Sequence, residues 1–364
     1  MTERDLVIIG GGPAGLACAM TALEAGLSVT LVDRNASLGG QLIKQTHKFF
    51  GSKEQYAKTR GFAIASSLIR KIKDHKNLDI RLGTHVVGLY SDLVVTTYDN
   101  RTYERLRART VVCATGASER TLAFENNDLP GIYGAGAVQT LMNLYGVIPG
   151  KEVVMVGSGN IGLIVSYQLM QAGVRVKALI EAAPTIGGYK VHASKLRRLG
   201  VDIRTRMTVK RAIGTDRITA VEVIAIDDDW QQLAGTEETI RTDALCIAVG
   251  LSPLNQLLAM LNVRTRFVNE LGGYVPVLSS TYMTSVPGLF ACGDVSGIEE
   301  ASAAMMEGYL CGLHVASYLN RELPDQNERI SHYEKELASL RSGPFGLKTR
   351  TGLNRIKEVI PDAR

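Results

Sequence analysis

The stretch Val7-Ile8-Ile9-Gly10-Gly11-Gly12-Pro13-Ala14-Gly15 decides the fold of this 364-residue chain. An apolar run of strand type leads into a GxGxxG turn, and a small-residue segment of helical type follows it. A second apolar run ends in Leu31-Val32-Asp33, where the acid stands 18 residues after Gly15. A strand, a glycine turn, a helix and a second strand ending in an acid are typical of a dinucleotide-binding unit.

The same signature occurs a second time. Val153-Val154-Met155-Val156-Gly157-Ser158-Gly159-Asn160-Ile161-Gly162 is followed by Leu179-Ile180-Glu181. A Gly-Gly pair trails each unit, at 39–40 and at 187–188. Two such units in one chain predict two dinucleotide cofactors that exchange electrons.

Each glycine of the fingerprint has a backbone role. The first makes the tight turn, the second lets the main chain approach a pyrophosphate, and the third lets helix and strand pack closely. The helix N-terminus offers free N–H groups and a positive dipole end to the phosphates. Asp33 and Glu181 then each accept hydrogen bonds from a ribose.

Composition narrows the remaining classes. The length allows two domains, and the net charge of +5 is mild, with no nucleic-acid signature. No stretch of about 18 apolar residues predicts a transmembrane helix. The start MTERDLVIIGGG carries charges where a signal peptide needs an apolar core, so we expect a cytoplasmic protein.

The five cysteines stand far apart in the sequence. They form no CxxC redox pair and no spacing typical of a metal or iron–sulfur site, so we expect buried structural thiols and no metal. They are Cys18, Cys113, Cys246, Cys292 and Cys311.

The rest of the chain repeats one plan, in which a βαβ unit precedes a β-meander and a strand that ends in glycine. The first copy has its meander at 84–112 and its last strand at 110–117. The second copy has strands at 207–226 and 237–249, and helices are expected at 55–75 and 190–199. A third strand-to-glycine element at 288–294 ends in Asp294 and precedes a helix at 299–314. An amphipathic helix at 325–341 and a surface arm or partner-binding tail at 342–364 complete the chain.

These motifs resemble those of the two-dinucleotide-binding-domain flavoproteins, the FAD-dependent pyridine nucleotide–disulfide oxidoreductase superfamily. The resemblance rests on both fingerprints, on Gly39-Gly40-Gln41-Leu42, on Ala114-Thr115-Gly116 and on Phe290-Ala291-Cys292-Gly293-Asp294. It implies an α/β fold with two Rossmann-like domains, each with a β-meander, in which the NAD domain is inserted in the FAD domain. The implied boundaries are 1–121 and 272–323 for the FAD domain, 122–271 for the NAD domain, and 324–364 for a C-terminal helix and basic tail.

The resemblance also implies the site residues. Asp294 would bind the ribityl chain, and Glu300 and Ala301 would lie near the flavin. The full FAD set is Gly10, Gly12, Pro13, Ala14, Gly15, Asp33, Arg34, Gly39, Gly40, Gln41, Thr46, Val86, Ala114, Thr115, Gly116, Gly293, Asp294, Glu300 and Ala301. The NAD(H) set is Gly157, Gly159, Asn160, Ile161, Gly162, Glu181 and Gly250. For Thr46 and His47, beside the expected flavin, a catalytic acid–base role and a positioning role both stay open.

The chain departs from the disulfide reductases of that superfamily because it lacks their paired cysteines. It is more similar to the flavoprotein α-type subunits of heteromeric sarcosine oxidase, opine oxidase and proline dehydrogenase and to the related hydrogen cyanide synthase subunit. That likeness rests on residues 129–140 and 145–151. Some members carry a cysteine-rich [2Fe-2S] module, which here would be a separate small protein.

The function expected from these features is electron transfer between FAD and NAD(H), in a subunit of an amine, imino-acid or hydroxy-acid dehydrogenase complex. A substrate-oxidising flavoprotein subunit and a small [2Fe-2S] protein are the expected partners. Glu181 without a basic neighbour at 182–185 favours NAD(H) over NADP(H). Two alternatives stay open: a stand-alone NADH-dependent flavin reductase or NADH oxidase, and a scaffold subunit with a structural adenine nucleotide in the second site.

Overall fold

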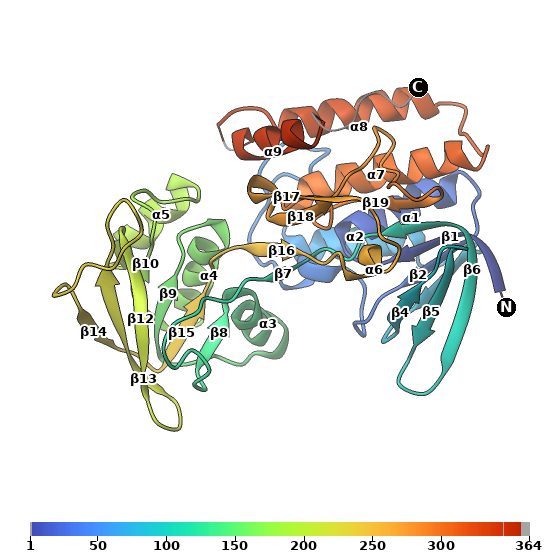
Figure 1. The fold of residues 1–364 in the computed structure, drawn as a ribbon. Coiled ribbons are helices and arrows are strands. Elements are labelled where there is room, and N and C mark those ends of the chain that lie inside the picture. The colour runs from blue at the N-terminus through green and yellow to red at the C-terminus, as the bar shows by residue number, and fades with distance from the viewer. Residues whose placement is uncertain (1, 345, 358–364) are drawn as a thin grey trace. The chain divides into compact units, whose positions relative to one another are not determined.

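The structure is a computed structural model that describes residues 2–344 and 346–357 (Figure 1). The chain forms two compact units. Unit 1 comprises the described residues up to Ser118 and from Ser252 onward, and unit 2 comprises Glu119–Leu251. Unit 2 is therefore inserted in the sequence of unit 1, which is the arrangement that the resemblance to the two-domain flavoproteins implies.

The sheet of unit 1 combines parallel strands with the expected meander. Its order is β3-β2-β1-β6-β5-β4, and β19 also pairs with β6. β3, β2, β1, β6 and β19 run parallel, whereas β4, β5 and β6 pair antiparallel. The meander and the strand at 110–117 are not separate, because the single strand β6 serves both. The strands are β1 Thr2–Ile9, β2 Val29–Val32, β3 Leu78–Arg81, β4 His85–Leu89, β5 Val94–Tyr98, β6 Tyr103–Cys113 and β19 Leu289–Ala291.

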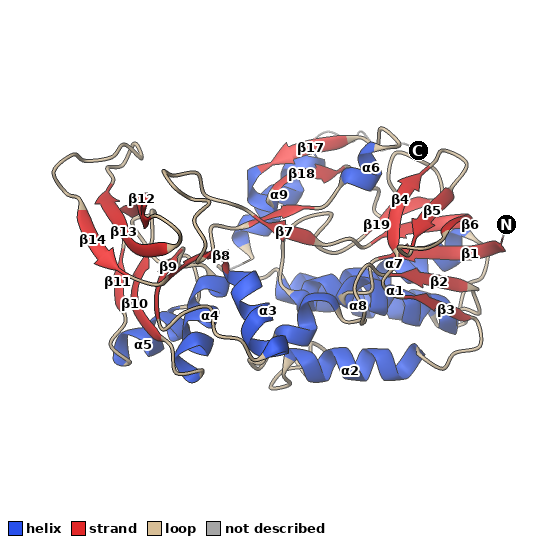
Figure 2. Ribbon diagram, turned by 90° about the horizontal axis from the view of Figure 1, so that it is seen from below, coloured by secondary structure: helices blue, strands red, loops and turns tan. Residues whose placement is uncertain are grey.

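Successive side chains of β1 point to opposite faces of the sheet and enter two different cores of unit 1. Leu6 and Ile8 are buried with residues of α1 (Pro13–Glu24), α2 (Gly61–Ile72) and α7 (Ala301–Tyr318). Val7 and Ile9 are buried with the meander on the other face. Figure 2 shows these helices together on one side of the sheet. The period of two in the first apolar run thus builds a two-faced strand.

Helix α2 is shorter than the sequence pattern indicates. The expected range was 55–75, whereas α2 begins at Gly61 and ends at Ile72. Tyr56 and Lys58 have φ values of 61° and 65°, which are incompatible with a right-handed helix. The segment before α2 is therefore a series of turns, with the short 3-10 helix η1 (Gly40–Lys44) further upstream.

Helices α1 and α7 pack closely because α7 is rich in small residues. A Cβ atom on Gly308 would stand 2.2 Å from the carbonyl oxygen of Ala14, and one on Gly312 would stand 2.1 Å from the Thr21 Oγ1. No side chain fits at either position without moving a helix. The expected helix at 299–314 thus has a reason for its glycines, and it extends to Tyr318.

The segment 252–271 belongs to unit 1, although the expected boundary placed it with the second domain. Leu258 and Val263 are buried in the same core as Val7 and Ile9, which fixes the segment to the sheet of unit 1. It contains α6 Gln256–Ala259, β17 Thr265–Val268 and η2 Asn269–Leu271, and β18 Gly273–Pro276 follows and pairs with β17.

The C-terminal region is part of unit 1 and is more than a surface arm. Leu337 of α8 (Gln326–Leu340) is buried in the core that contains α1 and α7. The expected tail at 342–364 contains α9 (Leu347–Lys357), whose Ile356 is buried against Leu271 and Val275. The last part of the expected tail, 358–364, lies outside the described residues.

Unit 2 repeats the plan of unit 1 on a smaller scale. Its parallel sheet has the order β11-β10-β9-β15-β8, and its meander has the order β12-β13-β14. The strands of the parallel sheet are β8 Ile132–Gly134, β9 Glu152–Val156, β10 Arg175–Ile180, β11 Asp202–Arg204 and β15 Ala244–Ile247. The meander consists of β12 Met207–Gly214, β13 Ile218–Ala225 and β14 Glu238–Arg241, and the helices are α3 Ala135–Tyr145, α4 Asn160–Gln171 and α5 Lys190–Arg198.

The chain crosses between the units twice. Strands β7 (Ala117–Glu119) and β16 (Leu251–Pro253) contain the crossings and form a two-stranded sheet. In the part of the chain that the structure describes, no helix has both the length and the apolar character needed to cross a membrane.

Candidate dinucleotide sites

The first fingerprint forms the tight turn between β1 and α1. Gly10 has φ +109°, and a Cβ atom there would stand 2.3 Å from the carbonyl oxygen of Ala114. A Cβ atom on Gly15 would stand 1.9 Å from the carbonyl oxygen of Gly10. Only glycine satisfies both positions, because one needs a left-handed backbone and the other needs helix and strand in contact.

Gly12 differs from these two glycines because it faces open space. It is the N-cap of α1 with φ −79°, and a Cβ atom on it would meet only the Gly40 Cα, at 3.9 Å. Gly40 has φ +53° and approaches Gly12 from the opposite side. Two bare backbones thus border the N-terminus of α1, where Pro13 begins the helix. The space that these two glycines leave at the helix N-terminus allows a pyrophosphate to approach closely. A larger side chain at Gly12 would fill this cradle.

Asp33 follows β2 and is nearly buried, with 6% of its surface exposed. Its carboxylate accepts hydrogen bonds from the backbone N–H of Gly11 at 2.7 Å and of Asn35 at 2.8 Å. The backbone N–H of Gly39 donates to the Gly11 carbonyl, which ties the Gly-Gly loop to the fingerprint. The acid therefore stands at the turn, as the spacing predicts, while Arg34 and Gln41 are exposed beside it.

The element from the far end of the sequence returns to the same turn. A Cβ atom on Gly293, just after β19, would stand 2.7 Å from the Ala14 Cβ in the first turn of α1. Asp294 is partly exposed, and the one hydrogen bond described for its carboxylate comes from the Glu299 backbone N–H at 3.3 Å. Loss of contact with water, together with the nearby Glu307 and Glu299 carboxylates, raises the pKa of Asp294 to about 7. A carboxylate with so few donors fits a ligand hydroxyl group.

The structure places the other expected FAD residues in unit 1 as well. The backbone carbonyl of Thr46 accepts a hydrogen bond from Arg60 at 2.7 Å, and the His47 ring stacks on Phe49. The Thr115 hydroxyl donates to the Leu254 carbonyl at 2.7 Å. Five further residues are placed by their elements: Val86 lies in β4, Ala114 and Gly116 follow β6, and Glu300 and Ala301 are the N-cap and first residue of α7.

The second fingerprint reproduces the first almost atom for atom. Gly157 has φ +101°, and its Cβ position is 2.2 Å from the Ala248 carbonyl oxygen. The Cβ position of Gly162 is 2.0 Å from the Gly157 carbonyl oxygen. Gly159 caps α4 and has nothing within 4 Å of its Cβ position. The duplication seen in the sequence is therefore a duplication of backbone geometry.

Ser158 was not expected in the second site, and it fixes the acid there. Its backbone N–H donates to Glu181 at 2.7 Å, its hydroxyl donates to the same oxygen at 2.5 Å, and the Ala183 N–H donates to the other oxygen at 2.8 Å. Gly187 donates its N–H to the Ser158 hydroxyl and Gly188 donates to the Ser158 carbonyl. The sequence signal for this role was the serine itself. The first fingerprint has Gly11 at the same position, and glycine has no side chain that could make these bonds.

The remaining NAD(H) residues surround the same turn. The Asn160 side chain accepts the backbone N–H of Tyr189 at 2.9 Å, Ile161 is exposed, and Gly250 has φ +114°. Arg206 reaches this loop from β12's start, where its backbone N–H donates to the Ala183 carbonyl. Its guanidinium pairs with Asp228. A basic residue thus comes near Glu181 from a remote part of the sequence.

The five cysteines are free and buried. Burial raises the pKa of Cys113 and of Cys246 to about 12. Three cysteines that are distant in the sequence meet in space, because Cys311 hydrogen-bonds both Cys18 and Cys292. Buried neutral thiols are poor nucleophiles.

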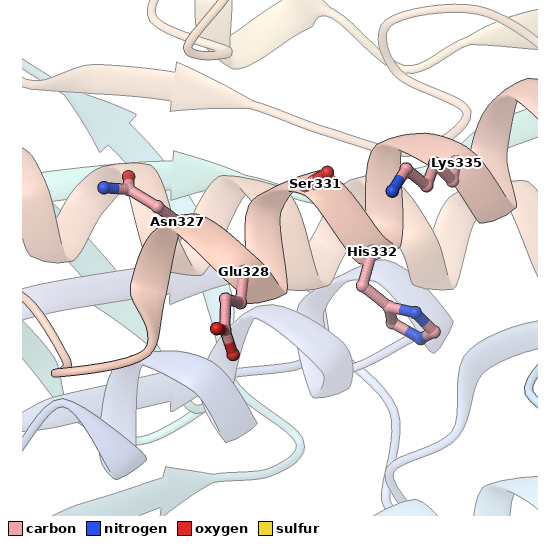
Figure 3. Close-up of a pocket in the computed structure, with 5 residues that line it drawn as sticks. All are labelled: Asn327, Glu328, Ser331, His332 and Lys335. Atoms are coloured by element: carbon pink, nitrogen blue, oxygen red, sulfur yellow. The ribbon is translucent and has the colours of Figure 1, made fainter.

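A group of charged residues behind the Gly293 turn was also missed. Glu307 of α7 accepts the Gly293 N–H at 2.8 Å, and Arg341 after α8 binds both Glu307 and Glu299. A glutamate inside a helix of buried small residues was the signal. Residues of α8 also line a shallow pocket, and their side chains point in different directions: Asn327, Glu328, Ser331, His332 and Lys335 (Figure 3).

The groups in both units fit a bound dinucleotide. Each unit offers a helix N-terminus bordered by glycine, a nearly or partly buried acid at the turn, and close helix–strand packing. Unit 1 adds Asp294, a carboxylate with few donors.

Comparison with known proteins agrees with this geometry. The sequence model of one family, described as pyridine nucleotide-disulphide oxidoreductase, matches residues 4–308. The hydrogen cyanide synthase subunit HcnB of Pseudomonas protegens is 28% identical over 92% of this chain and 75% of its own length. The sarcosine oxidase subunit alpha of Rhizobium meliloti is 32% identical over 70% of this chain. This chain spans only 25% of that relative.

A solved structure is similar over nearly the whole chain. The L-proline dehydrogenase from P. horikoshii has a TM-score of 0.70 and 25% identity, and the match covers 93% of this chain and 59% of that one.

Proposed function

Since the chain belongs to the pyridine nucleotide-disulphide oxidoreductase family, whose members are FAD-dependent enzymes that bind NAD(P), we propose that it is the electron-transfer subunit of a dehydrogenase complex. FAD would bind unit 1 and NAD(H) would bind unit 2. The complex would be cytoplasmic and would oxidise an amine, an imino acid or a hydroxy acid.

The duplicated turn carries this proposal. Gly12 and Gly159 are both N-cap glycines with open space at the Cβ position. Each stands beside an acid, Asp33 or Glu181, whose carboxylate accepts backbone N–H groups. FAD and NAD(H), when bound, supply the hydride chemistry. The protein holds the phosphates at the helix N-termini and the riboses at the two acids.

Asp294 supports the assignment of FAD to unit 1. Its carboxylate lies next to Gly293, which contacts the first turn of α1, so it would face a ligand that extends from the phosphate cradle. Unit 2 has no matching third element in its sequence. The longer cofactor therefore suits unit 1.

Glu181 supports NAD(H) in unit 2. Its carboxylate is fixed by Ser158 and Ala183, so it cannot easily turn away from a ribose. A 2′-phosphate at that position would meet a negative charge, and Arg206, whose backbone bonds to Ala183, pairs its guanidinium with Asp228.

The names of the relatives support a complex. Two of them are called subunits, of hydrogen cyanide synthase and of sarcosine oxidase. By analogy, the partners here would be a substrate-oxidising flavoprotein subunit and a small [2Fe-2S] protein. Thr46 and His47 are proposed to position the flavin or to act as acid–base groups.

The decisive experiment is purification of the native protein with identification of its companions, followed by NADH turnover with a dye. We expect a yellow complex of several subunits. We also expect NADH to reduce the flavin of the isolated chain. A lone chain or homo-oligomer that oxidises NADH rapidly would instead support the stand-alone reductase. Flavin that neither NADH nor NADPH bleaches, with an adenine nucleotide in unit 2, would support the scaffold.

A further inference from the structure

A largely buried ionic cluster lies behind the Gly293 turn in unit 1. At its centre is Arg341, which follows α8 and leaves only 16% of its side chain exposed. The guanidinium donates to Glu307 at 2.5 Å, and its Nε donates to both carboxylate oxygens of Glu299 at 3.1 Å. The side chains of Glu299 and Glu307 are only 11% and 10% exposed. One guanidinium thus binds two carboxylates at once.

Both carboxylate partners of Arg341, Glu307 and Glu299, also make hydrogen bonds to the Gly293–Asp294 turn. Glu307 accepts the backbone N–H of Gly293 at 2.8 Å through its other oxygen, which also lies 3.4 Å from the Ser296 hydroxyl. Glu299 donates its backbone N–H to the Asp294 carboxylate at 3.3 Å. Two of the hydrogen bonds that hold the turn therefore come from residues that Arg341 binds.

The charges at this place require Arg341. Three carboxylates, those of Asp294, Glu299 and Glu307, lie near one another, and the Arg341 guanidinium binds two of them, Glu299 and Glu307. Burial raises the pKa of Glu307, and the Arg341 charge opposes that rise. Removal of one partner from a buried ion pair leaves a charge that is neither solvated nor paired. Without Arg341, repulsion would separate Glu299 and Glu307 and displace the turn.

Contacts near the end of α8 fix the position from which Arg341 extends. Tyr333 stacks on Tyr309 of α7 with ring centroids 4.7 Å apart. Glu336 accepts hydrogen bonds from Ser52 and Gln55 at 2.9 Å and 2.8 Å. Figure 1 shows α8 alongside α7. These contacts come from different elements of unit 1, and they locate the helix from two sides.

We propose that Arg341 is a positioning residue for the FAD site: through Glu307 and Glu299 it fixes the Gly293–Asp294 turn against α1. The inference rests on the proposed FAD site in unit 1 and is independent of any partner subunit. Arg341 does not touch the cofactor. It acts by keeping the Asp294 carboxylate and the Gly293 backbone where the ligand needs them.

The test compares R341M with R329M. Arg329 of α8 is the control because it too binds two acids, Glu24 and Asp325, in more exposed pairs. Neither acid has a described hydrogen bond to the Gly293–Asp294 turn. The readout is the dissociation constant of FAD from the apoprotein of the full chain, measured by quenching of flavin fluorescence. We expect R341M to weaken FAD binding at least tenfold and R329M to change it less than twofold.

A rescue variant separates positioning from general stability. In R341M/E307Q one of the two unpaired charges is gone, so Glu299 no longer faces a second carboxylate at position 307. The amide oxygen of the new side chain can still accept the Gly293 N–H, so FAD affinity should recover by several-fold. R341K, which keeps the charge but loses the forked contact, should bind FAD with intermediate affinity, and it serves the same purpose if R341M does not fold.

Equal FAD affinity in R341M and R329M would overturn the inference. So would a double variant that binds FAD no better than R341M, because Arg341 would then act only through packing. Failure of the proposed function looks different: the unsubstituted chain would bind no FAD, or G12V would leave binding unchanged.

Discussion

Gly293 lies against Ala14, with 2.7 Å between the Ala14 Cβ and the position of a Cβ atom on Gly293. The contact joins the turn after β19 to the first turn of α1, two segments from opposite ends of the sequence. Gly293 also has φ +77°, which disfavours any other residue. The proposed FAD site is therefore assembled from segments that are distant in the sequence, and Gly293 is one of the places where they meet.

The two N-cap glycines allow the sites to be blocked one at a time. We expect G12V to fold but to lose FAD, with affinity reduced at least about a hundredfold, because the valine would occupy the pyrophosphate cradle. G159V should stay yellow but lose reduction by NADH. Both positions have extended φ and ψ angles and space for a Cβ atom, so the apoprotein tolerates the change. Flavin absorbance and stopped-flow bleaching measure the two effects.

The control for this pair is G15A. Its added Cβ atom would collide with the Gly10 carbonyl oxygen, so we expect loss of stability by several kcal/mol and not a selective loss of flavin. Full flavin content in G12V would show that the cradle at α1 is not the FAD site.

Nicotinamide preference is the next prediction. Reduction of the flavin by NADH should be at least about tenfold faster than by NADPH at subsaturating concentrations, because the fixed Glu181 carboxylate repels a 2′-phosphate. E181Q keeps an acceptor for Ser158 and Ala183 but removes the charge, and it should narrow the preference. Stopped-flow rates with both nucleotides provide the measurement, and equal rates in the unsubstituted chain would contradict the prediction.

The sequence predicts the fold well because backbone requirements leave strong signals. Gly10 and Gly15 have no alternative at their positions, and the apolar alternation at Val7 and Ile8 marks a strand that is buried on both faces. The boundary near 271 was less predictable. Leu258 and Val263 return to the core of unit 1, and an apolar residue does not reveal in which core it is buried.

The sites were predictable in part for the same reason. Glycines and acids at fixed spacing indicate each turn, whereas Ser158, Glu307 and Arg341 act through contacts between distant segments. Arg341 stands 34 residues from Glu307 and follows a different helix, α8. No local pattern encodes such a pair, because the spacing depends on how α7 and α8 pack.

Electron transfer should not need any cysteine. With the pKa of Cys113 and Cys246 raised to about 12, almost no thiolate exists near neutral pH. Each Cys→Ala variant should keep most NADH-to-dye activity and lose about 1 kcal/mol of stability. Cys18, Cys292 and Cys311 touch one another, so their losses should not add. A folded variant that retains FAD but has no turnover would revive a thiol mechanism.

Asp294 should make the stability of the apoprotein depend on pH. Its pKa is about 7 in the folded chain and near 3.8 in the unfolded chain, so the folded state binds more protons between these values. Stability therefore falls as pH rises from about 4 to 7. D294N should flatten that slope. Urea unfolding of the apoprotein at several pH values gives the measurement, and an unchanged slope in D294N would assign the effect to other groups.

Bound FAD should change this dependence. A ligand hydroxyl that donates to Asp294 favours the charged carboxylate and lowers its pKa. FAD affinity should therefore increase between pH 6 and pH 8 in the unsubstituted chain and vary less in D294N. Titrations of the apoprotein with FAD at these two pH values test the point, with R329M as a control that leaves Asp294 untouched.

The last prediction concerns the C-terminal segment. Truncation after Ser342 removes α9, whose Ile356 is buried against Leu271 and Val275, so we expect a loss of about 2–5 kcal/mol in the free energy of unfolding. FAD should still bind at low denaturant because Arg341 remains. If the basic segment also contacts a partner subunit, the truncated chain should co-purify less of it.

A full-length variant separates these two effects. I356A should reproduce much of the stability loss, because it empties the same apolar contact with Leu271, yet it keeps the basic segment and should retain the partner. Unfolding by urea and co-purification from the native source are measured for both variants. Loss of the partner in I356A as well would mean that the fold of α9, and not its charge, carries the contact. Unchanged stability after truncation would show that α9 contributes nothing to unit 1.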